Sequence, residues 1–268
     1  MLNIKTGMEK WFKRTGEKVI YFVHYVGEMS ILMAQTILLI PVRPMKRYRI
    51  LEQARKTGIS SFPIVSLIAL FTGMILALQM AYQMQKLSSE IYIANLVAVA
   101  LTRELAPVLT ALIVAGRIGA AITAEIGTMT VTEQIDALET LATNPVKYLV
   151  VPRFLSLALM LPVLTVYADL IGILGGFLIC VYKLNIGAQM YINMTIDALV
   201  VKDVVTGLIK TVFFGMIIAL VGCYEGLKAK GGAEGVGRAT TVSVVNSFIL
   251  IIATDCFFTA LFYFVFER

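Results

Sequence analysis

Histidine is nearly missing from this chain of 268 residues, in which His24 is the single example. A multi-histidine metal site and a histidine-based catalytic triad are therefore unavailable, and we interpret His24 as a structural residue. Cysteine is scarce too, and the three cysteines match no metal or disulfide spacing. The GxxxxGK[ST] pattern that holds nucleotide phosphates does not occur. We expect no catalytic site, metal or cofactor in this chain itself.

Charged residues are also few: they form 15% of the chain, while 59% is hydrophobic and the mean hydropathy is +0.85. A soluble domain is about 25% charged and about 45–50% apolar. Spanning a bilayer takes about 20 apolar residues, and five runs are long enough. The five predicted spans are 62–84, 91–116, 154–182, 204–224 and 243–265. Composition and run length thus predict an all-α membrane protein.

Segment 19–42 is also apolar, but basic clusters flank it on both sides. If it crossed the membrane, one cluster would lie outside, against the positive-inside rule. We therefore expect an interfacial or re-entrant helix with both ends in the cytoplasm. This choice puts seventeen Lys and Arg on the inside and four outside, so the N-terminus is cytoplasmic and the C-terminus external. The net charge of +6 then needs no nucleic acid partner, and we expect one domain, with an N-terminal region 1–60 and a core 62–266.

An acidic stretch, GTMTVTEQIDALE (127–139), lies in the predicted cytoplasmic loop between the second and third spans. Thr130 can cap a helix there, and Glu133 can close a capping box. Asn144-Pro145 ends the helix. We predict an acidic amphipathic helix of roughly three turns, suited to a groove of another protein. The apolar residues at helical spacing along it are Val131, Ile135, Leu138 and Ala142.

Arg103 and Glu104 lie inside the second predicted span, roughly 18–20 Å along a helix from Ile91 and so near mid-bilayer. Ionisable residues at that depth are costly, and by default they mark a functional site. The alternative is a structural pair whose charges neutralise each other. Weaker candidates, several of them near span ends, are Asp169, Asp197, Lys210, Glu225 and Asp255.

Small residues recur every four positions in GRIGAAITAEIG, at Gly116, Ala120 and Ala124. Such residues let membrane helices approach closely. The spacing fits packing within the chain and packing at a dimer seam equally well.

The sequence from Thr102 to Leu155, which contains both the charged pair and the acidic stretch, closely resembles the signature of the MlaE (YrbE) permease family. Members are membrane subunits of MCE-type ABC lipid transporters. GRATTVSVV (237–245) resembles the family's later cytoplasmic motif, and FTGMILALQ (71–79) resembles its first span. The resemblance covers most of the chain from about residue 50 onward.

The resemblance implies a homodimeric permease, each copy with an N-terminal interfacial helix, five spans and a cytoplasmic coupling helix at Thr130–Thr143. It implies a cytoplasmic ABC ATPase that binds ATP and Mg, often a small STAS-domain protein, and an MCE-domain protein that carries phospholipid outside. The expected location is the bacterial inner membrane, with the C-terminus periplasmic. The expected function is phospholipid movement between that membrane and the MCE partner, for outer-membrane lipid homeostasis and asymmetry.

The same resemblance implies two groups of site residues. The expected ATPase-coupling residues are Thr130, Glu133, Gln134, Ile135, Asp136, Leu138 and Glu139. The expected lipid-binding residues are Arg103, Glu104, Leu78, Ala81 and Tyr82. Ala81 stands where some members have an aromatic residue, so the cavity lining differs in detail.

Two other functions compete with the ABC permease. An ion-coupled lipid carrier would bind a proton on Glu104 and need no ATPase. A membrane scaffold would only anchor an MCE protein. The acidic helix favours the ABC permease, because neither alternative needs it.

Overall fold

The structure is a computed structural model that describes residues 2–41, 47–86, 89 and 92–266. Most of the described residues are helical and none of them forms a β-strand, which confirms the all-α prediction. Three of the elements, labelled η, are single π-helical turns: η2 and η3 lie inside the second span, and η4 begins the third. In chain order the elements are α1 (Leu2–Leu39), α2 (Arg47–Gln85), α3 (Ile93–Ala100), η2 (Leu101–Leu105), α4 (Ala106–Val114), η3 (Ala115–Gly119), α5 (Ala120–Val131), α6 (Gln134–Thr140), η4 (Val146–Val150), α7 (Val151–Tyr182), α8 (Ala188–Ala198), α9 (Val201–Leu227) and α10 (Gly232–Phe266).

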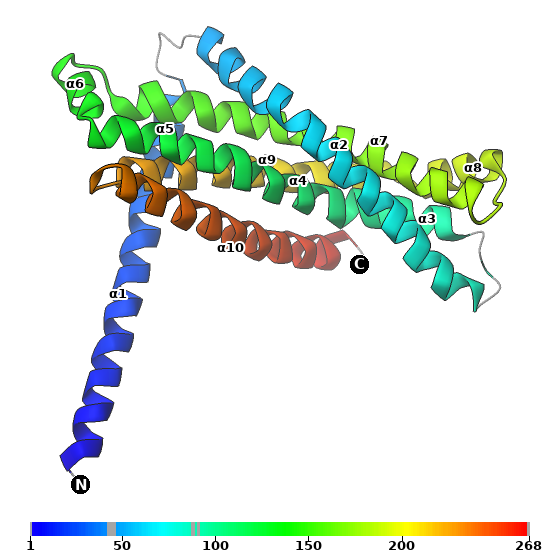
Figure 1. The fold of residues 1–268 in the computed structure, drawn as a ribbon, viewed down its shortest axis with the longest axis horizontal. Coiled ribbons are helices and arrows are strands. Elements are labelled where there is room, and N and C mark those ends of the chain that lie inside the picture. Colours follow the sequence, from blue (N-terminus) through cyan, green and yellow to red (C-terminus); the bar gives the residue numbers. More distant parts are fainter. Residues whose placement is uncertain (1, 42–46, 87–88, 90–91, 267–268) are drawn as a thin grey trace.

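Within the described residues, five helices are long and apolar enough to cross a membrane, so the five predicted spans are confirmed. Their bounds are Tyr48–Gln85, Ile93–Val131, Val146–Tyr182, Val201–Leu227 and Gly232–Phe264. All continue beyond the apolar runs in the sequence. Figure 1 shows an elongated bundle that α2 crosses obliquely, with α6 at one end and α8 at the other. We call the α6 end, predicted to face the cytoplasm, the inner end, and the α8 end the outer end.

Helix α1 leaves the bundle at a steep angle near the inner end and does not run alongside the spans (Figure 1). It is one continuous helix, without a re-entrant turn in the described part. Its apolar portion, Val23–Leu39, is shorter than the spans. Leu32 is buried against the bundle, whereas Ile31 and Leu38 are exposed. Of the two alternatives for this segment, the geometry favours the interfacial helix.

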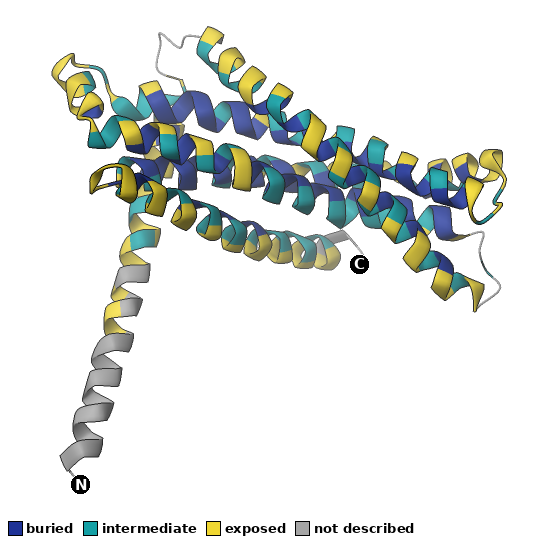
Figure 2. Cartoon of the chain, in the orientation of Figure 1, coloured by how far each residue is buried: buried dark blue, intermediate teal, exposed yellow. Residues whose placement is uncertain are grey.

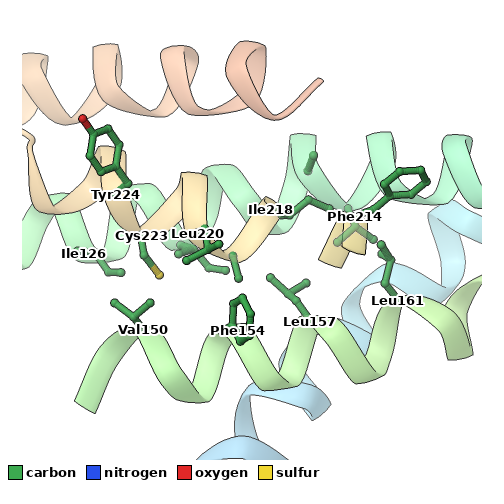
Figure 3. Packing of buried hydrophobic residues seen from close by; sticks show 14 of the residues in the cluster. Ile126, Val150, Phe154, Leu157, Leu161, Phe214, Ile218, Leu220, Cys223 and Tyr224 are labelled. Atoms are coloured by element: carbon green, nitrogen blue, oxygen red, sulfur yellow. The ribbon is translucent and has the colours of Figure 1, made fainter. Parts of the chain in front are cut away.

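The main hydrophobic core lies where α5, α7 and α9 meet (Figure 3). Phe154 and Leu157 of α7 pack with Phe214 and Ile218 of α9, and all four side chains are almost completely buried. Figure 2 shows burial concentrated in these inner helices, while α6, α8 and the outer face of α10 are exposed. Between membrane helices, such packing stabilises through van der Waals contact, because lipid tails are as apolar as the side chains.

The small residues of the 116–127 segment are divided between two faces. Thr123 faces inward, where its hydroxyl donates to the carbonyl oxygen of Gly222 on α9 at 3.0 Å. Gly116 is exposed, and Ala120 and Ala124 are partly covered. The inward face therefore serves packing within the chain, and Gly116 lies on a face that the single chain leaves open.

Candidate functional site

A break in helical regularity shapes the segment around Arg103 and Glu104. Residues Leu101–Leu105 form the π-helical turn η2 within the second span. Pro107 has no N–H group, so the carbonyl oxygen of Arg103 lacks the donor that a regular helix would supply. That oxygen accepts a hydrogen bond from the Lys210 ammonium on α9, at 3.4 Å. The break thus offers a main-chain acceptor to a neighbouring helix, in a bilayer region without water.

Lys210 is the centre of a charged group that we call the central cluster, formed with Glu104, Asp255 and Thr259. Its Nζ lies 2.9 Å from Glu104 Oε2 and 3.0 Å from Asp255 Oδ1. It also donates to Thr259 Oγ1 at 2.7 Å, and the Thr259 hydroxyl donates to Glu104 Oε1 at 3.1 Å. The Lys210 side chain is only 2% exposed. One buried ammonium therefore joins carboxylates from the second and fifth spans.

The net charge of the central cluster determines which rearrangements of its side chains are possible. With both carboxylates ionised, its two negative charges meet one positive charge. Among the described residues, no group of three or more His, Cys, Asp or Glu is placed to hold a metal ion. A buried charge that loses its partner is strongly destabilising, so a rearrangement here needs a replacement charge. A proton or the charged part of a ligand can supply it.

Arg103 has a different partner. Its Nε lies 3.9 Å from Asp203 Oδ1, in the first turn of α9, and its side chain is 36% exposed. Adjacent helical residues point about 100° apart, so Arg103 and Glu104 reach different neighbours. Glu104 pairs with Lys210 within the described chain, and neutralisation of Arg103 by Glu104 stays a prediction. Pairing between two copies stays a prediction.

The sequence alone did not reveal the centre of this site. Lys210 and Asp255 were weaker candidates, and neither Asp203 nor Thr259 was singled out. One signal was available: the fourth span contains a lysine and the fifth an aspartate, and opposite charges in membrane spans tend to pair. Spacing along one helix does not say which helices are neighbours, so grouping these residues required the fold.

The expected lipid-contacting residues of the first span lie on two faces of α2. Ala81 is buried at 4% exposure and packs in a cluster with Ile93 of α3. Leu78 and Tyr82 are 49% and 67% exposed, and the Lys86 ammonium lies 4.4 Å from the centre of the Tyr82 ring. In the single chain, Ala81 thus faces protein while Leu78 and Tyr82 face outward. Contact of these residues with lipid stays a prediction.

The predicted capping box in the acidic stretch is wrong. Thr130 lies inside α5, where its hydroxyl donates to the carbonyl oxygens of Ile126 at 2.9 Å and Gly226 at 3.0 Å. Glu133 precedes α6 with a left-handed φ of 59°, and its side chain makes no capping hydrogen bond. Because Thr130 is held against α9, α5 continues past it. Helix α6 therefore has only the seven residues Gln134–Thr140, roughly two turns.

The apolar stripe of α6 packs against its own chain. Ile135 is buried, and Leu138 is partly buried against the main core. Leu141, just after the helix, is 75% exposed. The remaining predicted coupling residues of this segment are exposed: Glu133, Gln134, Asp136 and Glu139. A partner would therefore contact the acidic face and Leu141 instead of the apolar stripe, and the coupling role itself stays a prediction.

Comparison with known proteins gives consistent matches along most of the chain. Residues 50–261 match the family described as Permease MlaE. A probable ABC transporter permease protein of Rickettsia conorii is 44% identical over 248 residues, which cover 92% of this chain and 96% of that protein. A protein with the same description from Synechocystis is 43% identical, and the match covers 79% of this chain and 80% of that protein. Another from Pyropia yezoensis is 36% identical, and the match covers 100% of this chain and 95% of that protein.

Proposed function

The chain belongs to the MlaE permease family of ABC transporters, and we propose that it moves phospholipid between the inner membrane and an MCE-domain partner. A permease of an ABC transporter works with a separate ATPase, which would bind the ATP and Mg that this chain has no P-loop to hold. In this proposal the N-terminus is cytoplasmic and the C-terminus periplasmic, as the asymmetry of basic residues indicates. A small STAS-domain protein would complete the cytoplasmic side.

The central cluster is the observation that carries the lipid proposal. Three ionisable side chains meet inside the spans, where an apolar packing role would be served better by apolar residues. Arg103 lies beside them and is partly exposed. Its planar guanidinium suits two phosphate oxygens at once. A phospholipid headgroup supplies such oxygens, and exchange between Asp203 and the phosphate would let lipid enter and leave.

The proposed second copy would lie against α10. This helix is the least covered of the five spans, and its outward residues Val245, Ile249 and Phe257 are exposed. Asp255 and Thr259 lie on the same helix, so a partner on α10 would lie close to the central cluster. These positions support a lipid path between two copies.

The proposed ATPase contact is the acidic face of α6 at the inner end. The buried side chain of Ile135 holds α6 to the bundle, so α6 connects the loop rigidly to the spans. Asp136 and Glu139 are exposed and would pair with basic residues of the ATPase. The face is therefore suited to transmit movement of the ATPase to α5 and α9.

An ion-coupled carrier remains a second candidate, and the charge balance of the central cluster favours it. Because two carboxylates share Lys210, a proton taken up by Glu104 or Asp255 would balance the charge. The two functions differ in their energy source. Membership in an ABC permease family supports ATP, and neither the carrier nor a scaffold requires the acidic face of α6.

The test is purification of the chain from native membranes. The proposal predicts a co-eluting ATPase, bound phospholipid identified by mass spectrometry, and lipid movement that stops with vanadate. A chain that elutes without an ATPase and moves lipid in response to a pH gradient would show the carrier instead. A chain that anchors an MCE protein without moving lipid would be a scaffold.

A further inference from the structure

A polar cavity of about 350 Å³ lies between α1 and the inner end of α9. Its volume is that of a small-ligand site. Glu225 in its wall lies fifteen residues beyond Lys210 on α9, roughly 22 Å along the helix, so the cavity is distinct from the central cluster. The lining residues are His24, Tyr25, Glu28, Tyr224, Glu225 and Lys228.

One side of the cavity is already neutralised. The Lys228 ammonium pairs with Glu28, and the Tyr224 hydroxyl donates to the same carboxylate at 2.5 Å. His24 Nδ1 lies 3.5 Å from the other oxygen of Glu28. These contacts fasten α1 to α9 and leave a lysine and an imidazole at the cavity edge.

Glu225 on the other side differs, because its hydrogen-bond partners among the described residues are neutral, and the nearby Lys228 ammonium, which attracts it through space, is bound to Glu28. The Asn246 amide of α10 donates to Glu225 Oε1 at 3.1 Å, and the Tyr25 hydroxyl is a second neutral donor. The side chain is partly buried, and the cavity lining holds two carboxylates, Glu28 and Glu225, against one lysine, so a further positive charge would be favourable there. Glu225 thus offers a prepared position for a cation.

Two further features of the cavity favour binding of a positively charged group beside Glu225. The rings of Tyr25 and Tyr224 meet edge to face, with centroids 5.0 Å apart. The Lys228 ammonium already lies 4.7 Å from the centre of the Tyr224 ring, and Tyr25 supplies a second aromatic ring of the kind that attracts cations. The last turn of α9 ends at Leu227 beside the cavity, and the C-terminal end of a helix carries partial negative charge.

We propose that this cavity binds the headgroup of a phospholipid that carries a primary ammonium, as in phosphoethanolamine. The ammonium lies against Glu225 and the Tyr25 ring, and the phosphate lies toward Lys228 and His24, where it competes with Glu28 for the lysine. A lipid is favoured over a soluble amine because the cavity opens at the end of a membrane span. It also lies beside Val23 of α1, whose apolar side chain is 63% exposed. The bound lipid would hold α1 on the membrane surface.

The test uses the assembled transporter, stripped of lipid in mild detergent and studied by native mass spectrometry. It is titrated with phosphatidylethanolamine and, separately, with phosphatidylglycerol of the same acyl chains. Glu225→Gln should weaken phosphatidylethanolamine binding at one site per chain at least about tenfold, because a charge-assisted hydrogen bond is lost, and leave phosphatidylglycerol unchanged. Tyr25→Phe, which keeps the ring, should weaken it less.

Two controls separate this site from others. Glu234→Gln removes an exposed charge at the same end of the bundle and should change nothing. Arg103→Ala should leave this site intact even though it affects the proposed transport site. Parent-like binding by both Glu225→Gln and Tyr25→Phe would overturn the proposal. Spermidine or free phosphoethanolamine that displaces the lipid at equal concentration would also overturn it, since the ligand would then be a soluble amine.

Discussion

The Lys210 ammonium lies 3.4 Å from the main-chain oxygen of Arg103, an acceptor that Pro107 leaves without its helical donor. A side chain of the fourth span thus completes the backbone of the second. The same ammonium holds Glu104 and Asp255, so one lysine links three spans. If α9 moves relative to the second span, either these contacts break or the contacting residues move with α9. The position of α9 is therefore linked to the charges on Lys210, Glu104 and Asp255.

Lys210→Met should destabilise the protein, because it leaves two partly buried carboxylates without their cation. The expected loss in free energy of unfolding is about 1–3 kcal/mol, below that of a fully buried pair because solvent screens both carboxylates in part. Thermal unfolding of the purified transporter measures it. Adding Glu104→Gln should restore part of the loss, since one of the uncompensated charges is removed. Lys202→Met, at an exposed position of α9, is the matched control, and an equal loss there would contradict a special role for Lys210.

Gly207→Ala should displace α9 from the η2 turn. A Cβ on Gly207 would lie 2.4 Å from the carbonyl oxygen of Thr102, too close for any side chain. The expected cost is about 1–3 kcal/mol, measured as a lower unfolding temperature. Gly237→Ala, a helical glycine with open space around it, should not destabilise the protein. A parent-like Gly207→Ala would show that η2 and α9 are not tightly fixed.

Reversing charge on the α6 face should release the ATPase. The double variant Asp136→Lys, Glu139→Lys changes two exposed residues and leaves the buried Ile135 in place. We expect normal membrane insertion, with at least a tenfold drop in co-purified ATPase. Glu234→Lys reverses an exposed charge elsewhere at the inner end and serves as control. Full ATPase recovery with the double variant would remove α6 from the interface.

The contact between α1 and α9 should weaken in acid. The hydrogen bond from Lys228 lowers the pKa of Glu28 from its ordinary value of 4.5. A depressed carboxyl pKa adds stability above the ordinary value, and this stability is lost as the pH falls through the lowered pKa. Between pH 7 and pH 3, the unfolding temperature of the parent protein should fall further than that of Glu28→Gln. Equal losses in the two proteins would show that this ion pair adds nothing.

Much of the fold could be predicted because each span is set by a local property. An apolar run long enough for the bilayer must become a helix, since lipid offers no partner for backbone groups. The basic clusters on both sides of 19–42 likewise predicted that this segment does not cross, and α1 runs at a steep angle to the spans, as an interfacial helix would (Figure 1).

The site was harder to predict because its contacts join distant parts of the chain. Thr130 has the residue type and spacing of a helix cap, yet its hydroxyl binds Gly226, almost a hundred residues away. Glu104 lies beside Arg103 in sequence but pairs with Lys210. Local patterns identified the segments that contain the site, and tertiary contacts decided what each side chain does.

The most direct test of the proposed function measures ATP-driven phospholipid transfer in proteoliposomes that hold the permease and its ATPase. The parent should transfer labelled phospholipid to an external acceptor only when ATP is hydrolysed. Arg103→Ala should bind the ATPase normally but transfer at least about tenfold less lipid, because a charged donor to phosphate is lost. Transfer by Arg103→Ala at the parental rate, or transfer by the parent without ATP, would contradict the proposal.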